Sequence, residues 1–501
     1  PKEIQGPLGQ ALSHFQAGRL PQSEAACRHI LQIDPDQANA LNLLGMIAQR
    51  SGKDDIAMQL ISKSVASNPN FADAHSNLGN LKMSMGQLDD AVASYRTAIS
   101  INPNFPDAYS NLGLVYARMG EHELALKNCR KAISLKADYA EPYNCLGIIH
   151  GEMGFEGRAI DCYRKAISIN RNFADAYTNL AVLLTRMGEL DKALDSAQKA
   201  VSLNPKSPKT HNNLGIIYNR IGRYDDAVAS FRTAIRIDPN NAESYNNMGN
   251  VYSNMGDLEQ ALLCHEEAIS INPYNPGARN NISLIQLLKG NFSDGWKNFE
   301  GRFVSAENLL LKKFPGFSAP QWNGEDLANK RILIWGEQGV GDEVLFTSMV
   351  PDQIRAGADI VLQSDKRLKP LLARSFPSVT CITTEEFGYD ENNVLKYDYH
   401  SPLGHMGNWL RPDQNSFPDR ASYLVADSDH RNQCRDRYLD FGNDTIVGIS
   451  WSSKGPDYGE GKSMSLPDLR PVLEIPGVTF VDLQYGDTGD ERAAFQKETG
   501  I

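Results

Sequence analysis

Apolar residues recur with helical spacing, in pairs of amphipathic stretches, from the start of the chain to about residue 290. A glycine separates the two stretches of each pair, and a small residue recurs five positions after it. Small residues let antiparallel helices approach closely and glycine permits the tight turn, so the pattern predicts helical hairpins. The glycines are Gly18, Gly52, Gly86, Gly120, Gly154, Gly188, Gly222, Gly256 and Gly290, and the small residues are Ala57, Ala91, Ala125, Ala159, Ala193, Ala227 and Ala261.

Prolines end the second helix of many pairs, as at Pro69, Pro103, Pro205, Pro239 and Pro273. No single pair can bury its apolar stripe, so stacked pairs are expected to share one core and to coil into a superhelix with a concave groove. Full units are expected at 38–71, 72–105, 106–139, 140–173, 174–207, 208–241 and 242–275, after an atypical unit at about 4–37.

A period of 34 residues with helix, turn and helix closely resembles the tetratricopeptide repeat. The resemblance implies an α-helical superhelix of about eight to nine repeats over residues 1–304, with a groove that holds an elongated partner. The columns Tyr116, Tyr218, Tyr252 and Tyr95, Tyr163, Phe231 are predicted to lie in the core.

A linker at residues 305–330 separates the repeats from a region in which strands and helices alternate. This alternation predicts parallel, doubly wound sheets, with a Rossmann-like domain at 331–440 and the start of a second one at 441–501. Residues Tyr397–Phe417 are expected to be rich in loops. Strands are predicted at Arg331–Gly336, Asp359–Gln363, Val379–Thr383, Thr445–Trp451 and Val478–Gln484.

Composition excludes several classes of function. A formal net charge of −11 argues against a nucleic-acid partner. The seven cysteines never occur as CxxC, so neither zinc nor a disulfide framework is indicated. No apolar run has the length of a membrane span, and no signal peptide is recognisable, so a cytoplasmic location is expected.

The turn Glu337–Asp342 connects a predicted strand to a helix and is rich in glycine. Its backbone N–H groups and the positive end of the helix dipole suit an anion or a polar sugar. It lacks a Walker lysine and fits GxGxxG poorly, which disfavours ATP and nicotinamide sites. Asp342 lies where α/β folds carry out chemistry, but it is equally placed to cap the following helix.

The run Trp322-Asn323-Gly324, followed by ILIWGEQGVGDEVLF and later by WSSKGPDYGEGKSMSLPDL, resembles the tetratricopeptide-linked relatives of bacterial heptosyltransferases. The resemblance implies a GT-B glycosyltransferase with two facing Rossmann-like domains and a single inverting displacement, using a nucleotide-sugar donor without a metal or other cofactor. It assigns the general base to Asp342. It assigns the group that neutralises the donor diphosphate to Lys462, or less closely Lys454.

The resemblance places the donor at Gly339, Gly341, Trp451, Ser452 and Lys462, although Lys462 is also compatible with a solvated loop. Only about sixty residues follow the start of the second domain at Thr445, fewer than the roughly one hundred of an ordinary domain. We expect a truncated second domain; the alternative is that donor binding has been lost and the scaffold kept.

An asparagine recurs in the first helix of the repeats. An amide can pair with a peptide backbone without reading side chains, but it can also stabilise contacts between repeats, and both interpretations remain open. The series resembles the asparagine ladder of the eukaryotic O-linked N-acetylglucosamine transferase, in architecture only. Its members are Asn77, Asn111, Asn179, Asn213, Asn247 and Asn281.

Two functions are therefore expected. In the first, a glycosyltransferase captures a polypeptide in the groove and transfers a sugar to Ser or Thr; similar architectures include flagellin-modifying enzymes. In the second, the chain is an interaction scaffold whose transferase-like part is vestigial. His400 and His405 could contact substrate, although a loop histidine usually has no such role.

Overall fold

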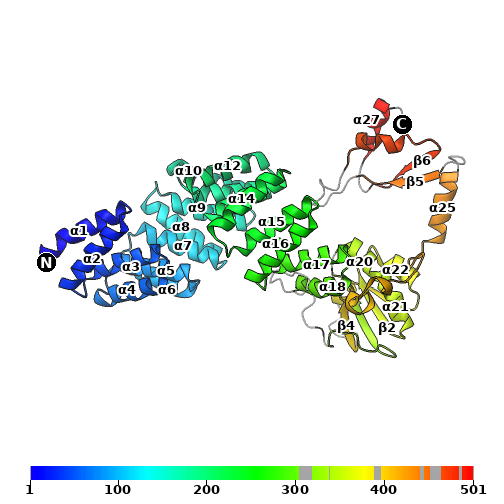
Figure 1. The fold of residues 1–501 in the computed structure, drawn as a ribbon, viewed down its shortest axis with the longest axis horizontal. Helices are drawn as coiled ribbons and strands as arrows, with labels where there is room; N and C mark the ends of the chain where they lie inside the picture. The colour runs from blue at the N-terminus through cyan, green and yellow to red at the C-terminus, as the bar shows by residue number, and fades with distance from the viewer. Residues whose placement is uncertain are drawn as a thin grey trace. The chain divides into compact units, whose positions relative to one another are not determined.

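The fold is described from a computed structural model that covers residues 2–303, 317, 319–337, 339–388, 396–439, 445–451, 464–484 and 488–499. The chain divides into two compact units, Pro1–Ile285 and Gln286–Ile501. The first is entirely helical and the second contains all of the strands described (Figure 1).

The first unit and the beginning of the second consist of successive antiparallel helix pairs. The pairs are α1 (Lys2–Gln16) and α2 (Leu20–Ile33), α3 (Ala38–Arg50) and α4 (Asp54–Ser67), α5 (Ala72–Ser84) and α6 (Leu88–Ile101), α7 (Pro106–Arg118) and α8 (His122–Leu135), α9 (Ala140–Glu152) and α10 (Glu156–Ile169), α11 (Ala174–Arg186) and α12 (Leu190–Leu203), α13 (Pro208–Arg220) and α14 (Tyr224–Ile237), α15 (Ala242–Asn254) and α16 (Leu258–Ile271), and α17 (Pro276–Leu288) and α18 (Phe292–Phe299).

Glycine occupies two positions in most of the hairpins. The turn glycines have φ between 69° and 81°, a conformation that other residues rarely adopt, which confirms their predicted role. In most hairpins the first helix also contains a glycine that faces a side chain of the second helix, and in several of them this side chain is a Tyr or Phe ring. A Cβ on Gly79 would lie 2.7 Å from Cε1 of Tyr95, and one on Gly215 would lie 2.7 Å from Cε1 of Phe231. The predicted close approach of the paired helices is therefore present.

The predicted core columns are mostly confirmed. Tyr95, Tyr163 and Phe231 are buried, as are Tyr116 and Tyr218, and the whole alanine column is fully buried. Only Tyr252 is partly exposed, although it still packs against the core. The repeats thus share a continuous interior, as the stacking of incomplete units requires.

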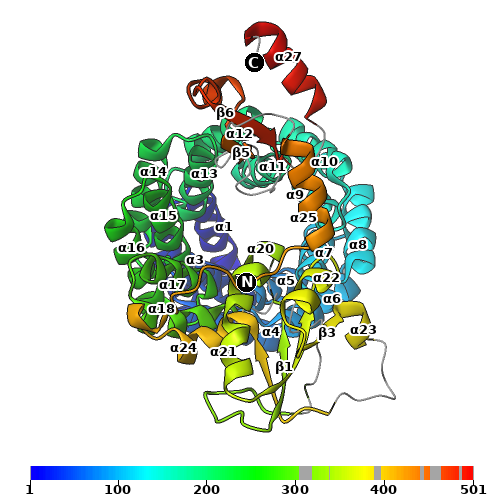
Figure 2. The same cartoon turned by 90° about the vertical axis from the view of Figure 1, so that its right-hand side faces the viewer.

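Within the first unit, the helices form two layers. Figure 2 shows the first helix of each pair on the inner side of the coil and the second helix on its outer side. The inner helices of neighbouring pairs also contact one another directly, as α5 does α7 and α7 does α9. Side chains that recur every 34 residues on the inner helices therefore form columns along the concave face.

The second unit contains a four-stranded parallel sheet in the order β3-β2-β1-β4 and a separate parallel pair, β5-β6. The helices that accompany these strands are short. The strands are β1 (Arg331–Trp335), β2 (Asp359–Ser364), β3 (Thr380–Thr383), β4 (Tyr399–Pro402), β5 (Thr445–Ile449) and β6 (Val478–Asp482); the helices include η1 (Glu300–Phe303), α20 (Val340–Phe346), α21 (Val350–Arg355), α22 (Lys369–Ser375), α23 (Thr384–Gly388), η3 (Leu403–Met406), α24 (Gly407–Leu410), η4 (Gln414–Ser416), α25 (Ser428–Leu439), α26 (Arg470–Leu473) and α27 (Gly489–Thr499).

Strand β4 lies in the segment that was expected to be rich in loops, where no strand was predicted. The strand is short and polar, and it is held by partners distant in sequence. It pairs with β1 from Ile332 to Trp335, and the ring of His400 stacks on Phe317 with 3.9 Å between centroids. Such tertiary pairing leaves little periodic signal in a four-residue strand.

Two further structural facts bear on function. Among the helices described, none combines the length and the apolar character needed to cross a bilayer. Within the same described ranges, no group of three or more His, Cys, Asp or Glu side chains is arranged to hold a metal ion.

Candidate functional site

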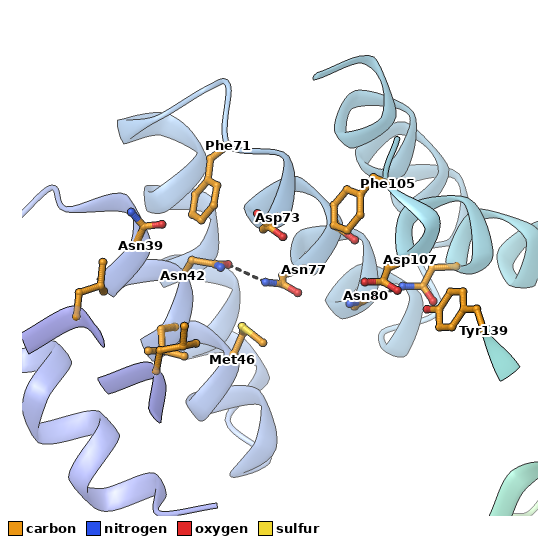
Figure 3. Close-up of a pocket in the computed structure, with 15 residues that line it drawn as sticks. Asn39, Asn42, Met46, Phe71, Asp73, Asn77, Asn80, Phe105, Asp107 and Tyr139 are labelled. Atoms are coloured by element: carbon orange, nitrogen blue, oxygen red, sulfur yellow. Dashed lines mark hydrogen bonds between the residues drawn. The ribbon is translucent and has the colours of Figure 1, made fainter. Parts of the chain in front are cut away.

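A large cavity of about 550 Å³ lies on the concave face of the first repeats. Its wall comes from the inner helices α1, α3, α5 and α7 and from the residues that precede α5, α7 and α9 (Figure 3). The lining residues are Leu8, Leu12, Asn39, Asn42, Leu43, Met46, Phe71, Asp73, Ser76, Asn77, Asn80, Phe105, Asp107, Asn111 and Tyr139.

The asparagine column lies on this concave face, and its members bond to the preceding repeat. The Nδ2 of Asn77 donates to Oδ1 of Asn42 at 3.1 Å, which is visible in Figure 3. Five of the six predicted ladder residues make such a bond, which supports a role between repeats. The other bonds join Asn111 to Asn80, Asn179 to Asn144, Asn247 to Asn212, and Asn281 to Asn246 and Asn250.

These bonds do not use the full hydrogen-bonding capacity of the side-chain amides. Each occupies one of the two amide hydrogens of the donor and leaves its own carbonyl oxygen available to another donor. Asn77 and Asn111 line the large cavity, and Asn179 lines a smaller one of about 170 Å³. In Asn213 the buried Nδ2 has no partner among the described residues. The ladder can therefore join repeats and still present polar groups to a peptide.

The first three members of a column of aromatic residues border the same cavity, and the column was not predicted as a site. Phe71, Phe105, Tyr139 and Phe173 each occupy the position before an inner helix, and all four are partly exposed. Their 34-residue spacing was visible in the sequence. Without the structure, however, the concave face could not be distinguished from the outer one, since aromatic residues also fill the core.

A column of carboxylates runs beside the aromatic residues in the first turn of the inner helices. Asp73, Asp107, Glu141 and Asp175 are all exposed. Asp107 lies next to the phenol of Tyr139. Burial, followed by the neighbouring carboxylates of Asp107 and Glu141, raises the pKa of Tyr139 above its ordinary value. The first repeats thus combine apolar, amide and acidic groups on one surface.

The second candidate site is the glycine-rich turn after β1. The backbone N–H of Gly339 donates to Oδ2 of Asp342 at 3.3 Å, so Asp342 closes the first turn of α20. The N-cap residue of α20 is Gly339, and Asp342 contributes to the cap from the third position of the helix. Asp342 remains partly exposed, and Gly341 beside it is exposed. Asp342 lines neither of the two cavities described above.

Other acidic residues of this turn have structural contacts that the sequence did not predict. Glu337 is buried and forms an ion pair with Arg302, with 2.6 Å between Nε and Oε2, and it accepts the N–H of Gly404 at 2.7 Å. Glu343 is buried and accepts the N–H of Asp365 at 2.9 Å. The turn is thus anchored on both sides of β1.

The expected donor residues are only partly visible. Trp451 is buried, and its Nε1 donates to the carboxylate of Glu491 at 3.1 Å. Ser452, Lys454 and Lys462 lie outside the described residues. The predicted contacts of these three residues with a donor diphosphate therefore stay a prediction.

The two loop histidines are held by neighbouring residues. Burial, followed by the charge of His405, lowers the pKa of His400 to about 4, so His400 is neutral at ordinary pH. His405 is buried, and its Nδ1 lies 2.9 Å from Oε1 of Glu300. Both histidines therefore contribute to packing around β4.

Comparison with known protein families identifies the type of the helical repeats. Models described as TPR repeat or tetratricopeptide repeat match overlapping segments that together span 79–275. The segments are 79–120, 106–139, 140–173, 174–207, 196–229, 217–256 and 242–275.

Protein FlbA of Caulobacter vibrioides is 34% identical over 232 residues, which is 43% of this chain and 38% of FlbA. This chain thus spans less than two fifths of the length of that curated relative.

Solved structures with similar folds include the APC/C hetero-tetramer Cut9-Hcn1, at 22% identity over 56% of each chain with a TM-score of 0.48. YrrB, described as a TPR protein with an unusual peptide-binding site, is 26% identical over 37% of this chain and 95% of its own, with a TM-score of 0.30. The repeat models by themselves identify the helical hairpins of the N-terminal region as tetratricopeptide repeats, the class of repeat that takes part in protein–protein interaction.

Proposed function

We propose that the repeats bind an extended polypeptide along the concave face of the inner helices. The observation that carries this proposal is the cavity of about 550 Å³, whose wall combines amides, aromatic rings and carboxylates from consecutive repeats. A peptide in extended form has unpaired backbone N–H and C=O groups along its length. A column of amides, which both donate and accept, offers partners to those groups.

The aromatic column supplies the apolar part of the binding surface. Phe71 and Phe105 border the cavity and are only partly buried, so a bound peptide would cover ring surface that is now in contact with water. Large, stiff aromatic side chains contribute much of the binding free energy at protein interfaces. Amides and rings together therefore support binding of an extended chain.

Truncation of the aromatic pair tests the proposal. Dodecapeptides that bind the full chain would be selected on an array, and their affinities measured by fluorescence anisotropy. Phe71→Ala/Phe105→Ala should weaken binding at least about tenfold, because two contact rings are lost. Phe155→Ala removes an exposed ring at the turn between α9 and α10 and should leave affinity unchanged. Equal losses in the two variants would contradict binding on the concave face.

A second candidate function is glycosyl transfer by the α/β part of the chain. The strand order β3-β2-β1-β4 supports it, because β1 lies where the direction of strand addition reverses, between β2 and β4. Open α/β sheets bind ligands at the carboxyl ends of strands at such a position. The turn that carries Asp342 begins directly after β1.

In this proposal, a Ser or Thr hydroxyl of the bound polypeptide attacks the anomeric carbon of a nucleotide sugar. The bond from that carbon to the diphosphate breaks, and the nucleoside diphosphate leaves with the electron pair. Asp342 accepts the hydroxyl proton, as a partly exposed carboxylate at the first turn of α20 is able to do. The anomeric configuration is inverted by this single displacement.

Release of nucleoside diphosphate from UDP-, GDP- and ADP-sugars by the full chain tests this second candidate. Asp342→Asn should lower the rate by about 10²–10⁴-fold, the usual contribution of a general base. Asp413→Asn changes a carboxylate that caps the turn η4 in the same unit and should leave the rate unaltered. The idea fails if Asp342→Asn matches the unaltered chain, or if that chain releases no nucleotide.

A further inference from the structure

The side chains that line the large concave cavity carry negative charge and no positive charge, which indicates the kind of ligand that can bind there. Among the fifteen lining residues are two carboxylates, Asp73 and Asp107, and no Lys, Arg or His. Within the described part of the chain, neither carboxylate has a cationic partner at ion-pair distance. Both side chains are exposed on the wall of the cavity.

The acidic character continues along the face. Glu141 and Asp175 occupy the same position in the next two repeats, so four consecutive inner helices begin with a carboxylate. The column ends at Lys209 in the following repeat. Glu243 holds this position again one repeat further on. The uninterrupted run of four carboxylates therefore lies on the repeats around the cavity and its immediate continuation.

The two carboxylates of the cavity are each accompanied by an aromatic ring two residues earlier: Phe71 with Asp73 and Phe105 with Asp107. In Figure 3 the rings of Phe71 and Phe105 lie near the carboxylates of the same wall. A guanidinium group can pair with a carboxylate while its plane or its stem covers an aromatic ring. The arrangement favours arginine over a compact ammonium.

We propose that the cavity takes an extended peptide segment rich in arginine, with each guanidinium group between a carboxylate and a ring of one repeat. The inference deepens the proposed polypeptide binding and rests on it. The inner helices α5, α7 and α9 contact one another directly, so their axes are roughly 10 Å apart. An extended chain covers that distance in about three residues, so arginine at every third position matches the repeats.

Three fluorescein-labelled dodecapeptides test the proposal with the full chain. Each contains four copies of Ser-Gly-X, where X is arginine, citrulline or glutamate; citrulline keeps the shape of arginine without its charge. The arginine peptide should bind about tenfold more tightly than the citrulline peptide, because two partly solvated ion pairs are added. The difference should shrink as salt is added.

Variants locate the effect. Asp73→Asn/Asp107→Asn should weaken binding of the arginine peptide about tenfold and leave the citrulline peptide unchanged. Asp89→Asn/Asp90→Asn removes the same charge from the outer helix α6 and should alter neither affinity. The inference is overturned if both pairs of substitutions have the same effect, because the preference would then reflect net charge alone.

The remaining outcomes separate this inference from the proposed function. Equal binding of all three peptides, weakened by Phe71→Ala/Phe105→Ala, would retain polypeptide binding and reject the preference for arginine. Binding of none of the three would reject the preference for arginine, while the peptides selected on the array would decide polypeptide binding separately. Tighter binding of the glutamate peptide would also reject the assigned charge of the occupant.

Discussion

Arg302→Met is expected to destabilise the α/β unit by about 3–5 kcal/mol, the usual effect of leaving one member of a buried ion pair unpaired. The guanidinium of Arg302 contacts Glu337 at 2.6 Å and 3.0 Å. It also lies over the rings of Phe299 and Phe303, 3.9 Å and 4.0 Å from their centroids. Methionine keeps much of the packing and removes the charge, while Glu337 stays 2% exposed.

The matched control replaces both partners. In Arg302→Met/Glu337→Gln both charges of the pair are removed, and a glutamine oxygen can still accept the N–H of Gly404, so most of the lost stability should return. All five tryptophans lie in the second unit, so tryptophan fluorescence during urea unfolding reports on it alone. If the single and double variants unfold at the same urea concentration, the ion pair does not hold the turn.

Phe231→Ala is expected to destabilise the repeats by about 3–5 kcal/mol, as for other buried phenylalanines. The ring is 1% exposed and lies against the backbone of Gly215 in the facing helix. Gly215→Ala alone should cost about 1–3 kcal/mol, because a new Cβ would be 2.7 Å from Cε1 of Phe231.

The effect of Gly215→Ala on the free energy of unfolding should change sign when Phe231 is also replaced by alanine. Once Phe231 is alanine, the methyl group of Gly215→Ala enters vacated space, and alanine favours a helix over glycine by about 1 kcal/mol. Gly215→Ala should therefore stabilise the Phe231→Ala variant. Far-UV circular dichroism during urea unfolding measures all four proteins of this cycle. If the two substitutions had strictly additive effects on the free energy of unfolding, the glycine would not be required by contact with the ring.

The repeats could be predicted almost completely, because the residues that determine each hairpin lie within that hairpin. A turn glycine, an interior small residue and a terminating proline recur at fixed positions, and local physics decides what each does. The sequence did not show, however, whether a recurring residue lies on the concave face of the superhelix or elsewhere on the repeats. Phe71 and Phe105 were not recognised as groove residues, since their exposure depends on the superhelix and not on one hairpin.

The α/β unit could be predicted less well. Strands β1 and β2 are apolar and buried, so their sequence is sufficient to find them. Strand β4 and the pair Arg302–Glu337 depend on contacts between residues 35 to 67 positions apart, which no short pattern reveals. The role of Asp342 likewise depends on what approaches the turn, and the chemistry of that carboxylate stays a proposal.

Site-specific cross-linking tests polypeptide binding on the concave face most directly. A photoreactive p-benzoylphenylalanine would replace Phe105 on the cavity wall or, in a second protein, Phe155 at the turn between α9 and α10. After irradiation with a bound dodecapeptide, the adduct should form at position 105 and not at position 155. Adducts at position 155 alone, or equal yields at the two positions, would contradict the account.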